Sequence, residues 1–154
     1  MLATAMPRIL KAVLFAATGF MLGAGVMFWG ADRGDALEEV NTLLVTSETI
    51  LGQPFSYPAQ KPAKVTAAIV TMPPGGKTGW HEHPVPLFAY ILEGEVTVDY
   101  GTHGKRIYRK GDSLMEAIDT AHDGYNTGQG VVRILAVFMG AEGVTNTTKV
   151  PSPK

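Results

Sequence analysis

The sequence predicts an all-β domain built around one hydrophobic core. Between residues 60 and 140, short stretches rich in β-branched and aromatic residues alternate with turns rich in glycine and proline. Several short strands at this spacing are typical of a sandwich or barrel. A length of 154 residues fits a single domain. Two blocks that contain histidine lie inside this β-rich part, and they form the candidate functional site.

The first 36 residues differ from the rest of the chain. Arg8 and Lys11 precede an uncharged apolar stretch, residues 12–30. A basic start followed by an apolar run indicates an export signal, and this run is close to the roughly 20 residues that cross a bilayer. We therefore expect a hydrophobic helix over residues 1–36, which is either a signal peptide cleaved after Ala36 or a membrane anchor. The protein is expected in the periplasm or otherwise outside the cytoplasm, secreted or tethered to the inner membrane.

Residues 37–59 are expected to lead into the domain. Leu37, Val40, Leu43 and Leu44 either line one face of a short helical turn or lie in an extended segment. The prolines that follow break the chain into turns, because proline disfavours helix at itself and at the preceding residue.

The domain itself is expected over residues 60–140, followed by a tail over residues 141–154. Strands are predicted at residues 65–72, 88–92, 95–100, 105–109, 113–116 and 131–138. Glycines lie at the joints between them, where positive φ or a tight reversal is needed: Gly94, Gly101, Gly104 and Gly111. The polar tail from Gly143 onward is expected at the surface or disordered.

His81 and His83 are separated by one residue. In an extended strand, alternate side chains point to the same face, so two imidazoles can reach one point. His122 is the candidate for a third, and three neutral imidazoles around a divalent ion leave positions for water or substrate. Asn126 is expected to be a structural hydrogen-bonding partner, and His103, in a Gly-Thr-His-Gly turn, is expected to be solvated.

The glycines around the histidines complete a pattern that resembles the cupin superfamily. The first cupin motif, G-x5-H-x-H-x3,4-E-x6-G, fits at Gly75, His81, His83 and Gly94. The second, G-x5-P-x-G-x2-H-x3-N, fits at Gly111, His122 and Asn126. The resemblance implies a small single-domain bacterial cupin with a double-stranded β-helix, or jelly-roll barrel. It also implies a homodimer, and a metal site whose ligands are His81, His83 and His122.

Three positions depart from the cupin pattern. The glutamate of the first motif falls at Leu87, and the proline and second glycine of the second motif fall at Ala117 and Asp119. The resemblance therefore implies a three-histidine site, as in thiol, diketone and gentisate dioxygenases. Without the carboxylate, the site favours an anionic ligand, unless Glu116, Asp119 or the neighbouring Glu82 restores the charge.

These observations predict one divalent metal ion, with iron or zinc favoured and manganese, nickel or copper open. The expected function is metal-dependent chemistry on a small molecule, with a dioxygenase-like reaction leading. A metal-dependent isomerase or lyase, a non-catalytic module that binds a small ligand or the metal, and a structural barrel with vestigial histidines are the alternatives. No catalytic side chain is assigned.

The surroundings of the site and the overall composition add two expectations. Leu87, Ala89 and Ile91 share one strand face, and with Met115 they form either plain core or an apolar pocket wall beside the metal. A formal net charge of −1 without a basic run argues against a nucleic-acid partner. The absence of cysteine excludes disulfides and thiolate ligands.

Overall fold

The computed structural model describes residues 40–59 and 61–153. The predicted signal or anchor helix therefore lies outside the described residues. Within the described part, no helix has both the length and the apolar character needed to cross a membrane. The lead-in follows the extended alternative, because residues 40–46 form no helix and Val40 and Leu43 are exposed.

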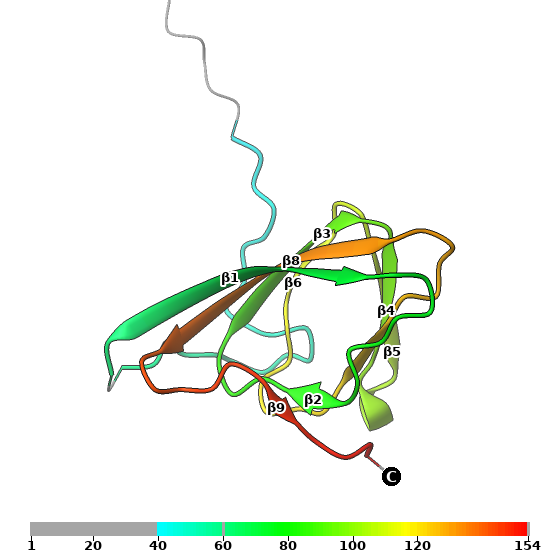
Figure 1. Cartoon of the computed structure of the whole chain (residues 1–154). Helices are drawn as coiled ribbons and strands as arrows, with labels where there is room; N and C mark the ends of the chain where they lie inside the picture. Colours follow the sequence, from blue (N-terminus) through cyan, green and yellow to red (C-terminus); the bar gives the residue numbers. More distant parts are fainter. Residues whose placement is uncertain (1–39, 60, 154) are drawn as a thin grey trace, which may run out of the picture. The chain divides into compact units, whose positions relative to one another are not determined.

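The described chain is all-β, as predicted. Its strands are β1 (Ala63–Met72), β2 (His81–Glu82), β3 (Leu87–Glu93), β4 (Glu95–Asp99), β5 (Lys105–Arg109), β6 (Ser113–Met115), β7 (Asp123–Tyr125), β8 (Val132–Ala141) and β9 (Thr148–Lys149), with a short 3-10 helix η1 (Gly101–His103). One sheet has the order β1-β8-β3-β6, a second has the order β5-β4-β7, and β2 pairs with β9. All pairs of these strands are antiparallel. Figure 1 shows β2 and β9 side by side, below the two larger sheets in that view.

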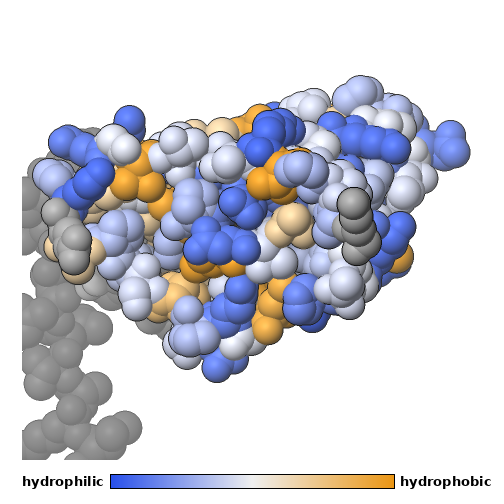
Figure 2. Space-filling view, turned by 90° about the horizontal axis from the view of Figure 1, so that it is seen from below, coloured by the Kyte–Doolittle hydropathy of each residue, from blue (hydrophilic) through white to orange (hydrophobic). Residues whose placement is uncertain are grey.

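The two larger sheets supply the core. Strand β3 alternates between buried and half-buried residues from Leu87 to Leu92, so its odd-numbered side chains point inward, as the sequence predicts. The buried cluster contains residues of both sheets: Met72, Ala89, Ile91, Val96, Val98, Tyr100, Tyr108, Leu114, Ala117 and Val132. On the face seen in Figure 2, hydrophobic residues lie in small patches between hydrophilic ones.

The predicted strands agree with the observed ones, with small shifts at their ends. The strand predicted at residues 105–109 coincides with β5, whereas β8 runs on to Ala141, past the predicted end at residue 138. The tail is expected at the surface or disordered, and no strand is predicted in it. Its residues 148 and 149 are exposed, but they form the ordered strand β9, which pairs with His81 and Glu82 of β2.

Gly94 joins β3 to β4 and is expected to tolerate no side chain. Its φ is +77°, and an added Cβ would lie 2.6 Å from the carbonyl oxygen of Val131. Gly111 also has positive φ, +96°, but its Cβ would meet no atom within 4 Å. We expect Gly111→Ala to lower the free energy of unfolding by about 1–2 kcal/mol, from backbone strain alone. Gly94→Ala combines strain with overpacking and is expected to cost roughly 2–5 kcal/mol. Urea unfolding of both variants measures the difference, and equal losses would contradict it.

Candidate metal centre

The structure brings the three predicted histidines together. His81 lies in β2, His83 directly follows that strand, and His122 directly precedes β7. The backbones of His81 and His122 are paired by reciprocal N–H···O bonds of 3.0 and 2.9 Å. Their side chains and that of His83 are buried, with 8%, 4% and 3% exposure for His81, His83 and His122. Each offers a ring nitrogen, and these nitrogens all lie within 4.8 Å of one another.

Backbone carbonyls fix the orientation of all three rings. The Nδ1 atoms of His81, His83 and His122 lie 2.7, 2.9 and 2.8 Å from the carbonyl oxygens of Gly79, Asn146 and Thr120. A carbonyl only accepts, so each neutral ring must carry its proton on Nδ1. Each Nε2 then keeps a free lone pair for a metal. Such outer hydrogen bonds are the usual support of metal-binding histidines, and the donor set therefore fits a divalent ion.

Burial favours the neutral form of the His81 and His83 imidazoles. It lowers the pKa of His81 below the ordinary value of 6.5 and lowers the pKa of His83 to about 3. In both cases the hydrogen bond to a carbonyl opposes the shift without cancelling it. Because the neutral form is the one that binds a metal, the site is ready to accept an ion at neutral pH.

The lowered pKa of His83 predicts that the metal-free protein loses stability as the pH falls. The unfolded chain takes up a proton near pH 6.5, whereas folded His83 does so only near pH 3. The contribution is complete above pH 6.5 and is lost as the pH falls toward 3. As the pH falls from 7 to 5, proton uptake at His83 in the unfolded chain is expected to lower the free energy of unfolding by about 2 kcal/mol. Chemical unfolding in the presence of a chelator should show this loss in the wild type, and His83→Asn should lack it. Parallel pH profiles of the two proteins would refute the assignment.

Glu116 is the carboxylate nearest to the histidines among the three candidates from the sequence. It is buried, and its Oε2 lies 3.9 Å from Nε2 of His122. Its Oε1 accepts hydrogen bonds from the Tyr100 hydroxyl, at 2.7 Å, and from the Ala117 amide, at 2.8 Å. Glu82, by contrast, is only half-buried, and Asp119 is exposed.

The tyrosines behind Glu116 continue the network. The hydroxyl groups of Tyr100 and Tyr108 lie 3.2 Å apart, and both rings are buried. Burial, with the charge of Glu116 second, raises the pKa of Tyr100 far above its ordinary value. Burial also raises the pKa of Tyr108 to about 12. Both tyrosines therefore stay protonated, and Tyr100 serves as a donor to Glu116.

Asn126 and His103 have the non-ligand roles that the sequence indicates. Asn126 is 2% exposed, and its Nδ2 donates to the carbonyls of Met72 and Gly130, at 2.9 and 2.8 Å. Its Oδ1 accepts from the Gly128 amide at 3.0 Å. Asn126 thus ties the end of β1 to the loop before β8. His103 lies exposed in η1.

Asp119, at the position of a motif glycine, keeps a backbone conformation typical of glycine. Its φ is +48°, and it is the one residue other than glycine with positive φ in the described chain. Its amide donates to the carbonyl of His83 at 3.0 Å. Asp is among the few residues that tolerate this region. The turn that leads to His122 is therefore preserved without the glycine.

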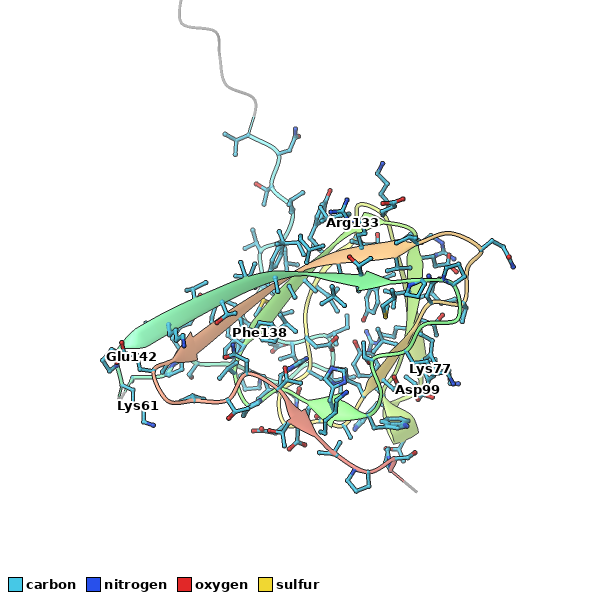
Figure 3. All side chains as sticks on the ribbon, in the orientation of Figure 1. Lys61, Lys77, Asp99, Arg133, Phe138 and Glu142 are labelled. Carbon is cyan, nitrogen blue, oxygen red and sulfur yellow. The ribbon has the colours of Figure 1, made fainter. Side chains whose placement is uncertain are left out.

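The histidines lie in the wall of an apolar pocket of about 240 Å³. Its lining residues are Val70, Met72, Thr78, His81, His83, Leu87, Ala89, Val96, Val98, Glu116, His122, Gly124, Ile134, Ala136, Phe138, Thr147 and Lys149. Phe138, labelled on β8 in Figure 3, packs edge-on against His83, with ring centroids 5.3 Å apart. Leu87 and Ala89 thus form part of the pocket wall, as one of the two expectations had it. Ile91 and Met115 are buried but do not line the pocket.

The C-terminal segment contributes to the site in a way that sequence reasoning missed. The carbonyl of Asn146 holds His83, and Thr147 and Lys149 line the pocket. The Lys149 ammonium donates to the carbonyl of Thr78, and the Val150 amide donates to the carbonyl of Trp80 at 3.1 Å. The β-branched residues Thr147, Thr148 and Val150 were the one available signal for a strand.

Comparisons with known proteins agree with this architecture. The family model of the cupin domain matches residues 68–138. No curated protein matches the chain. An uncharacterized conserved protein with a double-stranded β-helix domain, from Klebsiella pneumoniae, aligns with a TM-score of 0.50 and 14% identity, over 62% of this chain and 90% of that one. That likeness concerns the fold alone.

Oxalate decarboxylases are also among the similar structures. The enzyme from Lactobacillus farciminis, as a formate complex, aligns with a TM-score of 0.49 and 24% identity over 56% of this chain. The enzyme from Bacillus subtilis, studied for its Mn(II) centres, aligns with a TM-score of 0.47 and 23% identity over 56% of this chain. The chain covers only 26% and 24% of these two enzymes. The match to the cupin-domain model over residues 68–138 includes all three histidines of the cluster, and it agrees with the resemblance that the two motifs indicate.

Proposed function

We propose that the protein binds one divalent metal ion through His81, His83 and His122 and uses it on a small molecule in a dioxygenase-like reaction. One observation carries the proposal: three Nε2 lone pairs, oriented by carbonyls, face an apolar pocket. Iron or zinc is the favoured ion, and iron is the one that suits oxygen chemistry. When bound, such an ion supplies Lewis-acid or oxygen-activating chemistry.

The pocket indicates the class of molecule. Its volume of about 240 Å³ lies below the roughly 300–1,000 Å³ typical of pockets for drug-sized ligands. Most of the lining is aliphatic, with Phe138 at one side. Lys149 is exposed and lines the pocket as well, so it marks the side that solvent reaches. A small anion with an apolar body, such as a carboxylate or an enolate, fits this combination of a cationic end and apolar walls.

Oxygen consumption by the metal-loaded full chain tests the reaction class. The panel consists of small carboxylates, enolisable diketones and thiols, with oxygen uptake and product formation measured together. Uptake coupled to loss of one compound would support the proposal. Turnover without oxygen would replace it by a metal-dependent lyase or isomerase, and stoichiometric binding without turnover would replace it by a binding module. Ala89→Phe, which fills the pocket, should abolish turnover, whereas Ile107→Phe on the exposed part of β5 should preserve it.

We further propose that the protein acts outside the cytoplasm and forms a homodimer. Export is supported by the basic and apolar pattern of residues 8–30. Pairing is supported by β1, an edge strand of its sheet on which Val65 and Ile69 are 65% and 46% exposed. Exposed edge strands with apolar side chains favour association. Mass spectrometry of the protein from cell fractions tests export, and light scattering tests the dimer.

A further inference from the structure

We infer that Glu116 is the fourth protein ligand of the metal. The carboxylate then enters from the end of β6, since Leu87 of β3 has no donor atom at the position of the motif glutamate. The inference rests on the proposed metal site and deepens it. It changes the predicted site from three neutral ligands to three neutral ligands and one anion.

Glu116 lies close to His122 alone, since its carboxylate is not part of the group of three histidines whose ring nitrogens lie within 4.8 Å of one another. Metal bonds to imidazole nitrogen and to carboxylate oxygen are each about 2.0–2.2 Å long, so two ligands of one ion lie at most about 4.4 Å apart. The distance from Oε2 of Glu116 to Nε2 of His122 is 3.9 Å. That separation is too long for a hydrogen bond and short enough for a common ion.

The hydrogen bonds around both residues leave the two facing atoms as acceptors. Nδ1 of His122 donates to Thr120, so its Nε2 offers a lone pair. Oε1 of Glu116 is occupied by Tyr100 and Ala117, whereas Oε2 faces His122. Since each of these atoms can offer a lone pair, both would be attracted to a cation placed between them.

No lysine or arginine of the described residues forms an ion pair with Glu116. Among the salt bridges within residues 40–59 and 61–153, Glu116 has His122 as its sole partner. A buried carboxylate without a compensating charge is costly, and a metal ion supplies that charge. The Tyr100 hydroxyl and Ala117 amide then act as the outer hydrogen bonds that orient a ligating carboxylate.

A carboxylate ligand alters the chemistry expected of the site. It is a hard oxygen donor, which shifts the preference toward Fe²⁺ or Mn²⁺ and away from copper. It also lowers the net charge of a divalent ion and its protein ligands together from two to one. A single anionic group on the small molecule then neutralises the site, so a monoanion is the matching ligand class.

Mn²⁺ and Co²⁺ binding to the full chain tests the inference. Dissociation constants come from competition with a chelator, and the ligand field comes from the visible spectrum of bound Co²⁺. Glu116→Gln keeps the shape and the hydrogen-bonding atoms but removes the charge. We expect it to weaken binding of both ions by at least about 10–100-fold, the range measured for outer-shell losses, and to change the Co²⁺ spectrum. Glu82→Gln, which removes the charge of the half-buried carboxylate between His81 and His83, should change neither the affinities nor the Co²⁺ spectrum.

Tyr100→Phe is the second variant, for the case in which Glu116→Gln does not fold. It leaves the carboxylate in place and removes one of its two hydrogen bonds, so we expect weaker binding by about 10-fold. Unchanged affinity and an unchanged Co²⁺ spectrum in folded Glu116→Gln would overturn the inference while leaving the three-histidine site intact. A wild-type chain that binds neither ion would overturn the proposed function itself.

Discussion

His122→Ala is expected to abolish stoichiometric metal binding. His122 is the ligand that joins the two motifs, since its backbone pairs with His81 and its ring lies 4.4 and 5.1 Å, between centroids, from the rings of His81 and His83. Loss of an outer hydrogen bond costs about 10–100-fold in metal affinity, and loss of a ligand should exceed 100-fold. Elemental analysis of the full chain, purified without a histidine tag, should find one equivalent of metal in the wild type and little in the variant.

His103→Ala is the matched control for this experiment. His103 lies exposed in η1 and takes no part in the cluster. It should keep the full equivalent of metal, because its ring is solvated and its removal leaves the three Nε2 atoms in place. A full equivalent in His122→Ala, or equal losses in both variants, would show that the ion is held elsewhere.

Removal of residues 146–154 is expected to weaken metal binding while the two larger sheets stay folded. The truncation deletes β9 and the Asn146 carbonyl that orients His83, so affinity should fall by about 10–100-fold. It leaves the β1-β8-β3-β6 and β5-β4-β7 sheets complete. Calorimetric titration with Mn²⁺ measures the affinity, and circular dichroism measures the fold.

A shorter truncation separates the role of β9 from that of the chain end. Ending the chain after Val150 removes the exposed last residues but keeps β9 and the Val150–Trp80 hydrogen bond. It should bind Mn²⁺ like the full chain. If the longer truncation binds equally well, the Asn146 carbonyl has no part in orienting His83.

Local sequence signals predicted most of the fold, for identifiable physical reasons. Short runs with β-branched and aromatic residues, bounded by turns that contain glycine, located β3, β4 and β5. Gly94 and Gly111 marked two joints, since both adopt positive φ. The pairing of His81 with His83 also followed from spacing, because alternate side chains of an extended strand share a face. His122 was implied by the resemblance of the second block to the cupin motif.

The missed features depend on contacts between distant segments. Strand β9 has two exposed residues, so no pattern of burial reveals it, and its pairing with β2 spans almost seventy residues. The choice among Glu82, Glu116 and Asp119 likewise needed the structure. Glu116 reaches the site because Ser113–Met115 pairs with Phe88–Tyr90 of β3, which brings the end of β6 beside the histidines.

The carbonyls that hold the three imidazoles affect which mutations the metal centre can tolerate during evolution. They belong to the main chain of Gly79, Thr120 and Asn146, so a side-chain replacement at these positions does not remove the acceptor. The aliphatic residues that line the pocket, in contrast, would contact a bound molecule through their side chains. Mutation can therefore reshape molecular recognition while the ion-holding groups keep their tautomers. The path of the backbone thus keeps the orientation of the histidines, while the side chains that line the pocket can vary.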